Sequence, residues 1–108
     1  MGKLALAAGL LLVSSVAVHA QDQGDAAKGL EFVRKNCTPC HSVEKGEQAR
    51  SVHTAPSFQA VSDTPGMTSL ALTAWFLTPH PTMPNLVIAT RDVRDINAYI
   101  LSLKSERQ

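Results

Sequence analysis

The chain has 108 residues, 44% of them hydrophobic, and a formal net charge of +1. A nucleic-acid-binding domain normally carries a basic excess on one face, so this charge balance argues against that class. The length is that of one small domain, which buries a modest fraction of its surface and often needs a covalent staple or a cofactor for stability.

The first twenty residues have the organisation of a secretory signal peptide. Lys3 supplies a short positive region, residues 4–13 form an uncharged apolar run, and small residues follow up to Ala20. The run is too short to span a bilayer comfortably, since a transmembrane helix needs about 20 residues. We therefore expect cleavage after Ala20, export to the periplasm, no permanent membrane anchor and a mature domain of residues 21–108. An uncleaved anchor is the alternative.

A helix is predicted over residues 26–36, directly after Asp25, which is a suitable N-cap residue. One stripe carries the small or apolar residues Ala26, Gly29, Leu30 and Val33, and charged residues lie at other positions of the helix. The helix would lead directly into Cys37.

Residues 37–41 read Cys-Thr-Pro-Cys-His, and this C-x-x-C-H pattern is the attachment signature of c-type haem. The thiols of Cys37 and Cys40 would add to the two vinyl groups, and His41 would reach the iron as an axial ligand. The chain has two cysteines in all, so no other thiol competes for them. We expect one covalently bound haem c, with its apolar disc at the centre of the core.

Two other uses of the Cys37–His41 motif fit the chain less well. A thiol–disulfide oxidoreductase also uses a C-x-x-C pair, but its fold requires a βαβ pattern that the chain lacks. A zinc site would have three clustered ligands, and the adjacent Cys40 and His41 are an awkward pair for one tetrahedral ion.

After the motif, residues 42–65 are polar and contain helix breakers, so we expect mostly loop there. A second helix is predicted over residues 66–78, where Pro79 stops an apolar pattern made by Met67, Leu70, Ala71, Ala74, Trp75 and Thr78.

A final helix is expected with Thr90 as its cap and Asp92 in its first turn. Its apolar stripe consists of Val93, Ile96, Ile100 and Leu103, and Tyr99 lies beside this stripe. No segment reads convincingly as a strand. The pattern predicts an all-α fold, with three or more helices wrapped around the covalently attached haem.

The second axial ligand is predicted to be Met83. Pro79, Pro81 and Pro84 restrict the surrounding loop, which lowers the cost of presenting a weak thioether ligand. His80, in the same loop, is the main alternative and would give a bis-histidine haem of lower potential. Two further candidates are less suitable, because Met67 has the spacing of a core residue and His53 lies in a polar loop.

Beyond the motif, the sequence resembles the class I cytochrome c family over nearly all of residues 21–108. The segments that carry this resemblance are 24–29 with Val33 and Cys37, 41–46, 55–56, 75–79, 83–84 and 95–100. The family's aromatic residue before the first cysteine is replaced by Val33, with Phe32 one position earlier. The segment between Pro79 and Met83 is also short, which favours a small bacterial periplasmic member.

The resemblance implies roles for several residues. The Pro56 carbonyl would accept the Nδ1–H of His41, which orients the ring and raises its basicity. The last helix would cross the first near Gly29, where the missing side chain lets two backbones approach closely. Trp75 would pack on the haem or donate its indole N–H to a propionate, with an ordinary core aromatic as the alternative.

The function implied is that of an electron carrier and not an enzyme. A haem iron with two strong axial ligands has no open position, so single-electron exchange with redox partner proteins is its natural use. We expect a monomer, with Lys28, Lys35, Lys45 and Arg50 as candidate charges of the partner-facing surface. The alternatives are a haem subunit of a larger periplasmic oxidoreductase, and a sensor or catalytic haem without Met83 on the iron.

Overall fold

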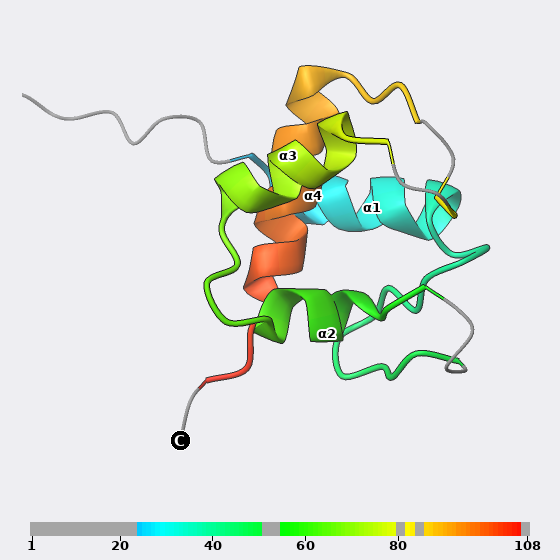
Figure 1. The fold of residues 1–108 in the computed structure, drawn as a ribbon, viewed down its shortest axis with the longest axis vertical. Helices are drawn as coiled ribbons and strands as arrows, with labels where there is room; N and C mark the ends of the chain where they lie inside the picture. The colour runs from blue at the N-terminus through cyan, green and yellow to red at the C-terminus, as the bar shows by residue number, and fades with distance from the viewer. Residues whose placement is uncertain (1–23, 51–54, 80–81, 84–85, 107–108) are drawn as a thin grey trace, which may run out of the picture.

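The computed structural model describes residues 24–50, 55–79, 82–83 and 86–106. These residues form four helices, α1 (Ala26–Asn36), α2 (Phe58–Asp63), α3 (Ser69–Leu77) and α4 (Thr90–Ser102), and contain no strand (Figure 1). The all-α prediction is confirmed. The predicted signal peptide lies outside the described residues.

Helices α1 and α4 cross at very short range. A Cβ atom at Gly29 would lie 2.0 Å from the Asp95 carbonyl oxygen and 2.8 Å from the Tyr99 Cβ. A residue with a side chain would therefore push the helices apart, and glycine is required. The predicted crossing near Gly29 is confirmed. Asp25 caps α1 as expected, because its carboxylate accepts hydrogen bonds from the amides of Ala27 and Lys28.

The hydrophobic core lies where α4 meets the other helices and the loop after α1. The predicted apolar stripe of α4 is fully buried. The core cluster comprises Val33, Cys37, Val43, Phe58, Leu72, Ile96, Tyr99, Ile100 and Leu103. Since Cys37 belongs to this cluster, the motif begins at the edge of the core.

The described part of residues 42–65 is mostly loop, as expected, and it also contains the short helix α2. Ser57 caps it by accepting a hydrogen bond from the Ala60 amide at 3.1 Å. Gln59 is buried and donates to the Leu103 carbonyl oxygen at 2.7 Å, while its own oxygen accepts from the Gly46 amide at 2.9 Å. A six-residue helix has little stability of its own, so these tertiary contacts account for it.

Helix α3 is shorter than predicted, and the side of it that is buried is not the one that the apolar pattern indicated. Gly66 has a φ of +78°, and Thr68 caps the helix by accepting from the Ala71 amide, so the helix begins at Ser69. Leu72 is its one buried residue. The apolar spacing predicted a helix correctly, but Leu70 and Trp75 of that pattern are exposed and do not face the polypeptide core.

The start of α4 also differs in detail. Its N-cap is Ala89, which makes no side-chain capping bond, so Thr90 lies inside the first turn and the predicted threonine cap is wrong. Asn97 ties α4 to α3 by donating to the Ser69 carbonyl oxygen at 3.1 Å and to the Thr73 hydroxyl at 2.8 Å.

Candidate functional site

The Cys37–His41 motif forms a tight turn at the end of α1. The Cys37 amide donates to the Val33 carbonyl oxygen at 2.8 Å, which closes the helix. The Cys37 carbonyl oxygen then accepts hydrogen bonds from the amides of Cys40 at 3.2 Å and His41 at 2.9 Å. Both thiols and the imidazole are thus held close to one helix end.

The two thiols have different environments. Cys37 is buried and Cys40 is exposed, and burial together with the neighbouring Cys40 raises the pKa of the Cys37 thiol to about 11. Cys37 is also the C-cap residue of α1, at the negative end of the helix dipole. A reactive thiolate needs a low pKa and a positive environment, so the Cys37 thiol does not suit thiol–disulfide exchange.

The ring of His41 is oriented by a backbone carbonyl. Its Nδ1 atom lies 2.7 Å from the Pro56 carbonyl oxygen, the contact that the family resemblance implies. A carbonyl oxygen can only accept, so Nδ1 carries the proton and Nε2 keeps its lone pair for a metal. The Phe58 ring lies beside the imidazole, with 4.9 Å between ring centroids.

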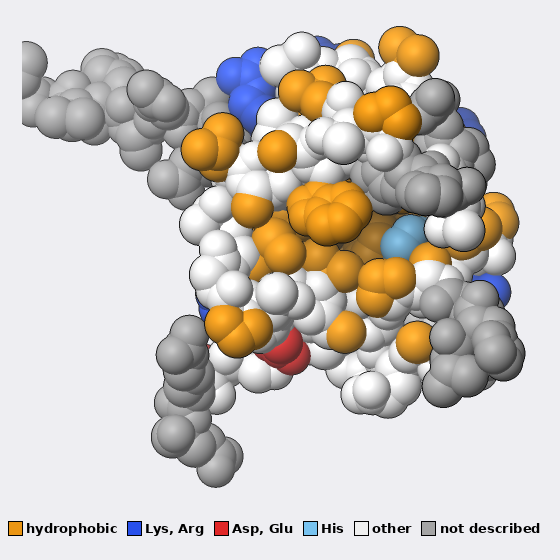
Figure 2. All heavy atoms as spheres, in the orientation of Figure 1, with side chains coloured by type: hydrophobic (Ala, Val, Ile, Leu, Met, Phe, Trp, Pro, Cys, Tyr) orange, Lys and Arg blue, Asp and Glu red, His pale blue; other side chains and the backbone are white. Residues whose placement is uncertain are grey.

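Apolar side chains are exposed on α3. Leu70 and Leu77 are exposed, and Trp75 is 58% exposed, so Trp75 is not an aromatic residue of the polypeptide core. Figure 2 shows hydrophobic side chains gathered between α3 and α2 around a histidine, and His41 is the histidine of the described residues. An exposed apolar area of this kind marks a binding site.

The candidates for the second axial ligand differ in their surroundings. Met83 is half-buried in a bend and is not among the side chains that pack against the core in the described part of the chain. Met67 does pack against that core, as expected, although it lies before the start of α3. His53 and His80 lie outside the described residues.

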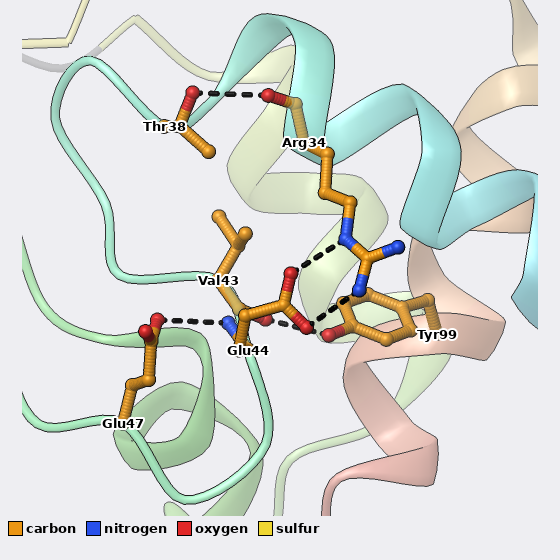
Figure 3. A network of polar contacts seen from close by, with 6 residues as sticks. All are labelled: Arg34, Thr38, Val43, Glu44, Glu47 and Tyr99. Carbon is orange, nitrogen blue, oxygen red and sulfur yellow. Dashed lines mark hydrogen bonds and ion pairs between the residues drawn. The ribbon is translucent and has the colours of Figure 1, made fainter.

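A polar network holds the loop that follows the motif, and Figure 3 shows its members. Arg34 on α1 makes two hydrogen bonds to the carboxylate of Glu44, at 2.6 and 2.9 Å. Tyr99 on α4 donates to the Val43 carbonyl oxygen at 2.6 Å. Sequence reasoning missed these contacts, because no spacing rule links their partners, which are 10 residues apart for Arg34 and Glu44 and 56 apart for Tyr99 and Val43.

Taken together, the residues fit a covalently attached haem. Cys37 and Cys40 supply two thiols, His41 presents a free Nε2 atom, and the exposed apolar side chains of α3 could cover a macrocycle. No group of three or more histidine, cysteine or acidic side chains placed to hold a metal ion occurs in the described segments.

Comparison with known proteins identified a relative of similar length. The chain is 35% identical to cytochrome c-552 of Bradyrhizobium diazoefficiens over 98 residues, which cover 89% of this chain and 93% of that protein. No family model and no solved structure matches the chain. Within the described residues, none of the helices combines the length and apolarity needed to cross a membrane.

Proposed function

Because the chain belongs to the class I cytochrome c family, we propose that it is an exported electron carrier with one haem c, covalently bound through Cys37 and Cys40. His41 and Met83 would hold its iron. The observation that carries this proposal is the contact between His41 Nδ1 and the Pro56 carbonyl oxygen, which leaves Nε2 as the free ring nitrogen beside two unpaired thiols.

Once bound, the haem supplies a one-electron couple between ferric and ferrous iron. The protein determines how that couple behaves. Pro56 fixes the ring of His41 and makes it a better donor, and the soft thioether of Met83 favours the ferrous state. Apolar side chains around the site, Trp75 among them, exclude water and fill the space beside the ring. The indole N–H of Trp75 is a candidate donor to a propionate.

The partners of such a carrier are redox proteins that approach the exposed edge of the haem. The formal net charge of +1 provides little long-range steering, so docking depends on short-range contacts. No substrate chemistry is required of this chain, and we propose that it acts as a monomer in the periplasm.

Optical spectra of the purified mature protein in both oxidation states test the proposal. We expect a mass increase of one haem that survives acid extraction, a low-spin ferrous spectrum, and a thioether-to-iron charge-transfer absorption in the ferric state. A colourless protein with the mass of the bare polypeptide would exclude the proposed function. A covalent haem that lacks the charge-transfer absorption would exclude Met83 as a ligand and favour a bis-histidine or open site.

A further inference from the structure

Arg50 reaches back from the following loop to the Cys37–His41 motif. It lies nine residues beyond His41, and its Nη2 atom donates to the His41 carbonyl oxygen at 3.0 Å. The same nitrogen donates to the Thr38 carbonyl oxygen, which is 12 residues away in the chain. Arg50, Thr38 and His41 also line one cavity of about 400 Å³. A single guanidinium nitrogen therefore bridges two carbonyls of the motif.

This bridge complements the contacts inside the turn. The Cys37 carbonyl oxygen is already occupied by the amides of Cys40 and His41. Arg50 donates to two other carbonyls of the motif, those of Thr38 and His41. The motif's backbone is therefore held both by hydrogen bonds within the turn and by a side chain from the following loop. Pro56 holds the imidazole ring, whereas Arg50 holds the backbone that carries it.

The charge of Arg50 is not matched by an ion pair in the described part of the chain. The ion pairs found there join Lys28 with Asp25 and Arg34 with Glu44. Glu44 and Glu47 line the same cavity as Arg50, but Glu44 is paired with Arg34, and Glu47 makes no ion pair with Arg50 while it accepts from the Glu44 amide at 3.0 Å. A guanidinium stays protonated at every physiological pH, so a positive charge persists beside the backbone of the axial histidine.

We propose that Arg50 is a positioning residue for His41 and that its charge raises the reduction potential of the haem. Reduction adds one electron at the iron, and a nearby positive charge stabilises the reduced state more than the oxidised state. The bridge to Thr38 and His41 keeps that charge in place and limits movement of the ligand's backbone. This inference rests on the proposed function, because it requires a haem on His41.

The test compares variants of the haem-bearing protein. Arg50→Gln removes the charge, Arg50→Lys keeps the charge but not the planar guanidinium, and Arg91→Gln removes the same charge from the first turn of α4. Arg91 is a suitable control because it lines a groove between α1 and α4 and not the motif's cavity. Reduction potentials are measured by spectroelectrochemistry at low and high salt, and exchange of the His41 Nδ1 proton is followed by NMR.

We expect Arg50→Gln to lower the potential, so that the oxidised fraction rises a few-fold relative to the reduced fraction at a fixed ambient potential. The Nδ1 proton should exchange faster in the same variant. Arg50→Lys should recover most of the potential while exchange stays fast, and Arg91→Gln should match wild type in both.

Three results would overturn the inference. Arg50→Gln could keep the wild-type potential, Arg91→Gln could lower the potential equally, or Arg50→Lys could fail to recover it. Failure of the proposed function is distinguishable from these, because it would be seen in the wild-type protein as the absence of a covalent haem.

Discussion

Tyr99 and Val43 lie 56 positions apart in the chain, and the phenol of Tyr99 donates to the Val43 carbonyl oxygen at 2.6 Å (Figure 3). Both residues are buried. Val43 follows His41 by two positions, so this bond attaches α4 to the loop that leaves the haem motif. Burial is the main cause of the raised pKa of Tyr99, followed by the charge of Glu44. The phenol therefore keeps its proton in the folded protein.

Tyr99→Phe should destabilise the protein by about 1–3 kcal/mol, because it leaves a buried carbonyl oxygen without its donor. The raised pKa also predicts a pH dependence. The folded state holds the phenol proton more tightly than the unfolded state, so its contribution is present below the ordinary tyrosine pKa and is lost as the pH rises toward the folded value. Urea unfolding from neutral to alkaline pH measures both effects. If Tyr99→Phe lost stability at alkaline pH as wild type does, Tyr99 would not be the cause of that loss.

Gly29→Ala should lower the free energy of unfolding by about 3 kcal/mol, because the added Cβ collides with the Asp95 carbonyl oxygen. The control is Gly46→Ala, where a Cβ would meet nothing within 4 Å and the positive φ of 78° is the sole penalty. That penalty is about 1–2 kcal/mol. Thermal and denaturant unfolding compare the two. Equal losses would mean that the α1–α4 crossing can open without cost.

Glu44→Gln should change the acid stability of the protein. The hydrogen bond from Arg34 is the main cause of the lowered pKa of Glu44. Its contribution is thus present above the ordinary glutamate pKa and is lost as the pH falls through the lower folded value. Both side chains are largely exposed, so the effect should stay below about 1 kcal/mol and shrink in high salt.

Unfolding curves at neutral and acidic pH, with Glu31→Gln on α1 as the control, measure this difference. The control should retain the acid-induced loss seen in wild type, whereas Glu44→Gln should show a smaller loss. Identical profiles for the two variants would refute a stabilising role for the Arg34–Glu44 pair.

Met83→Ala should open the sixth position of the iron. We expect the variant to lose the thioether-to-iron absorption and to bind carbon monoxide quickly. Met67→Ala should keep the absorption but lose about 1–3 kcal/mol of stability, because Met67 is partly buried against the core. His80→Ala should retain the wild-type spectrum. If His80→Ala opened the iron and Met83→Ala did not, the haem would be bis-histidine ligated.

The helices that could be predicted from sequence are those whose stability comes from a regular local pattern. The stripe of α4 and the capped start of α1 follow the helical repeat, and their burial agrees with it. The motif at residues 37–41 is equally local, because its chemistry depends on residue types at fixed spacing. The resemblance to a known family added the crossing at Gly29, which no periodicity reveals.

The other features depend on contacts between distant segments. The residues of helix α2 show no helical repeat of apolar positions. The helix is stabilised by Gln59, whose hydrogen-bond partners include a residue 44 positions away. The bridge from Arg50 could not be predicted, because the chain between Arg50 and its carbonyl partners shows no pattern that brings them together.

Helix α3 combines both cases, because its formation follows a local pattern and its burial depends on distant contacts. Its apolar residues recur with helical spacing, so the sequence alone determined that a helix forms there. Only the tertiary structure decided which of them the polypeptide covers, and it leaves Leu70, Trp75 and Leu77 exposed. The spacing of apolar residues along a segment indicates its local conformation. Their burial depends instead on which distant parts of the molecule pack against that segment.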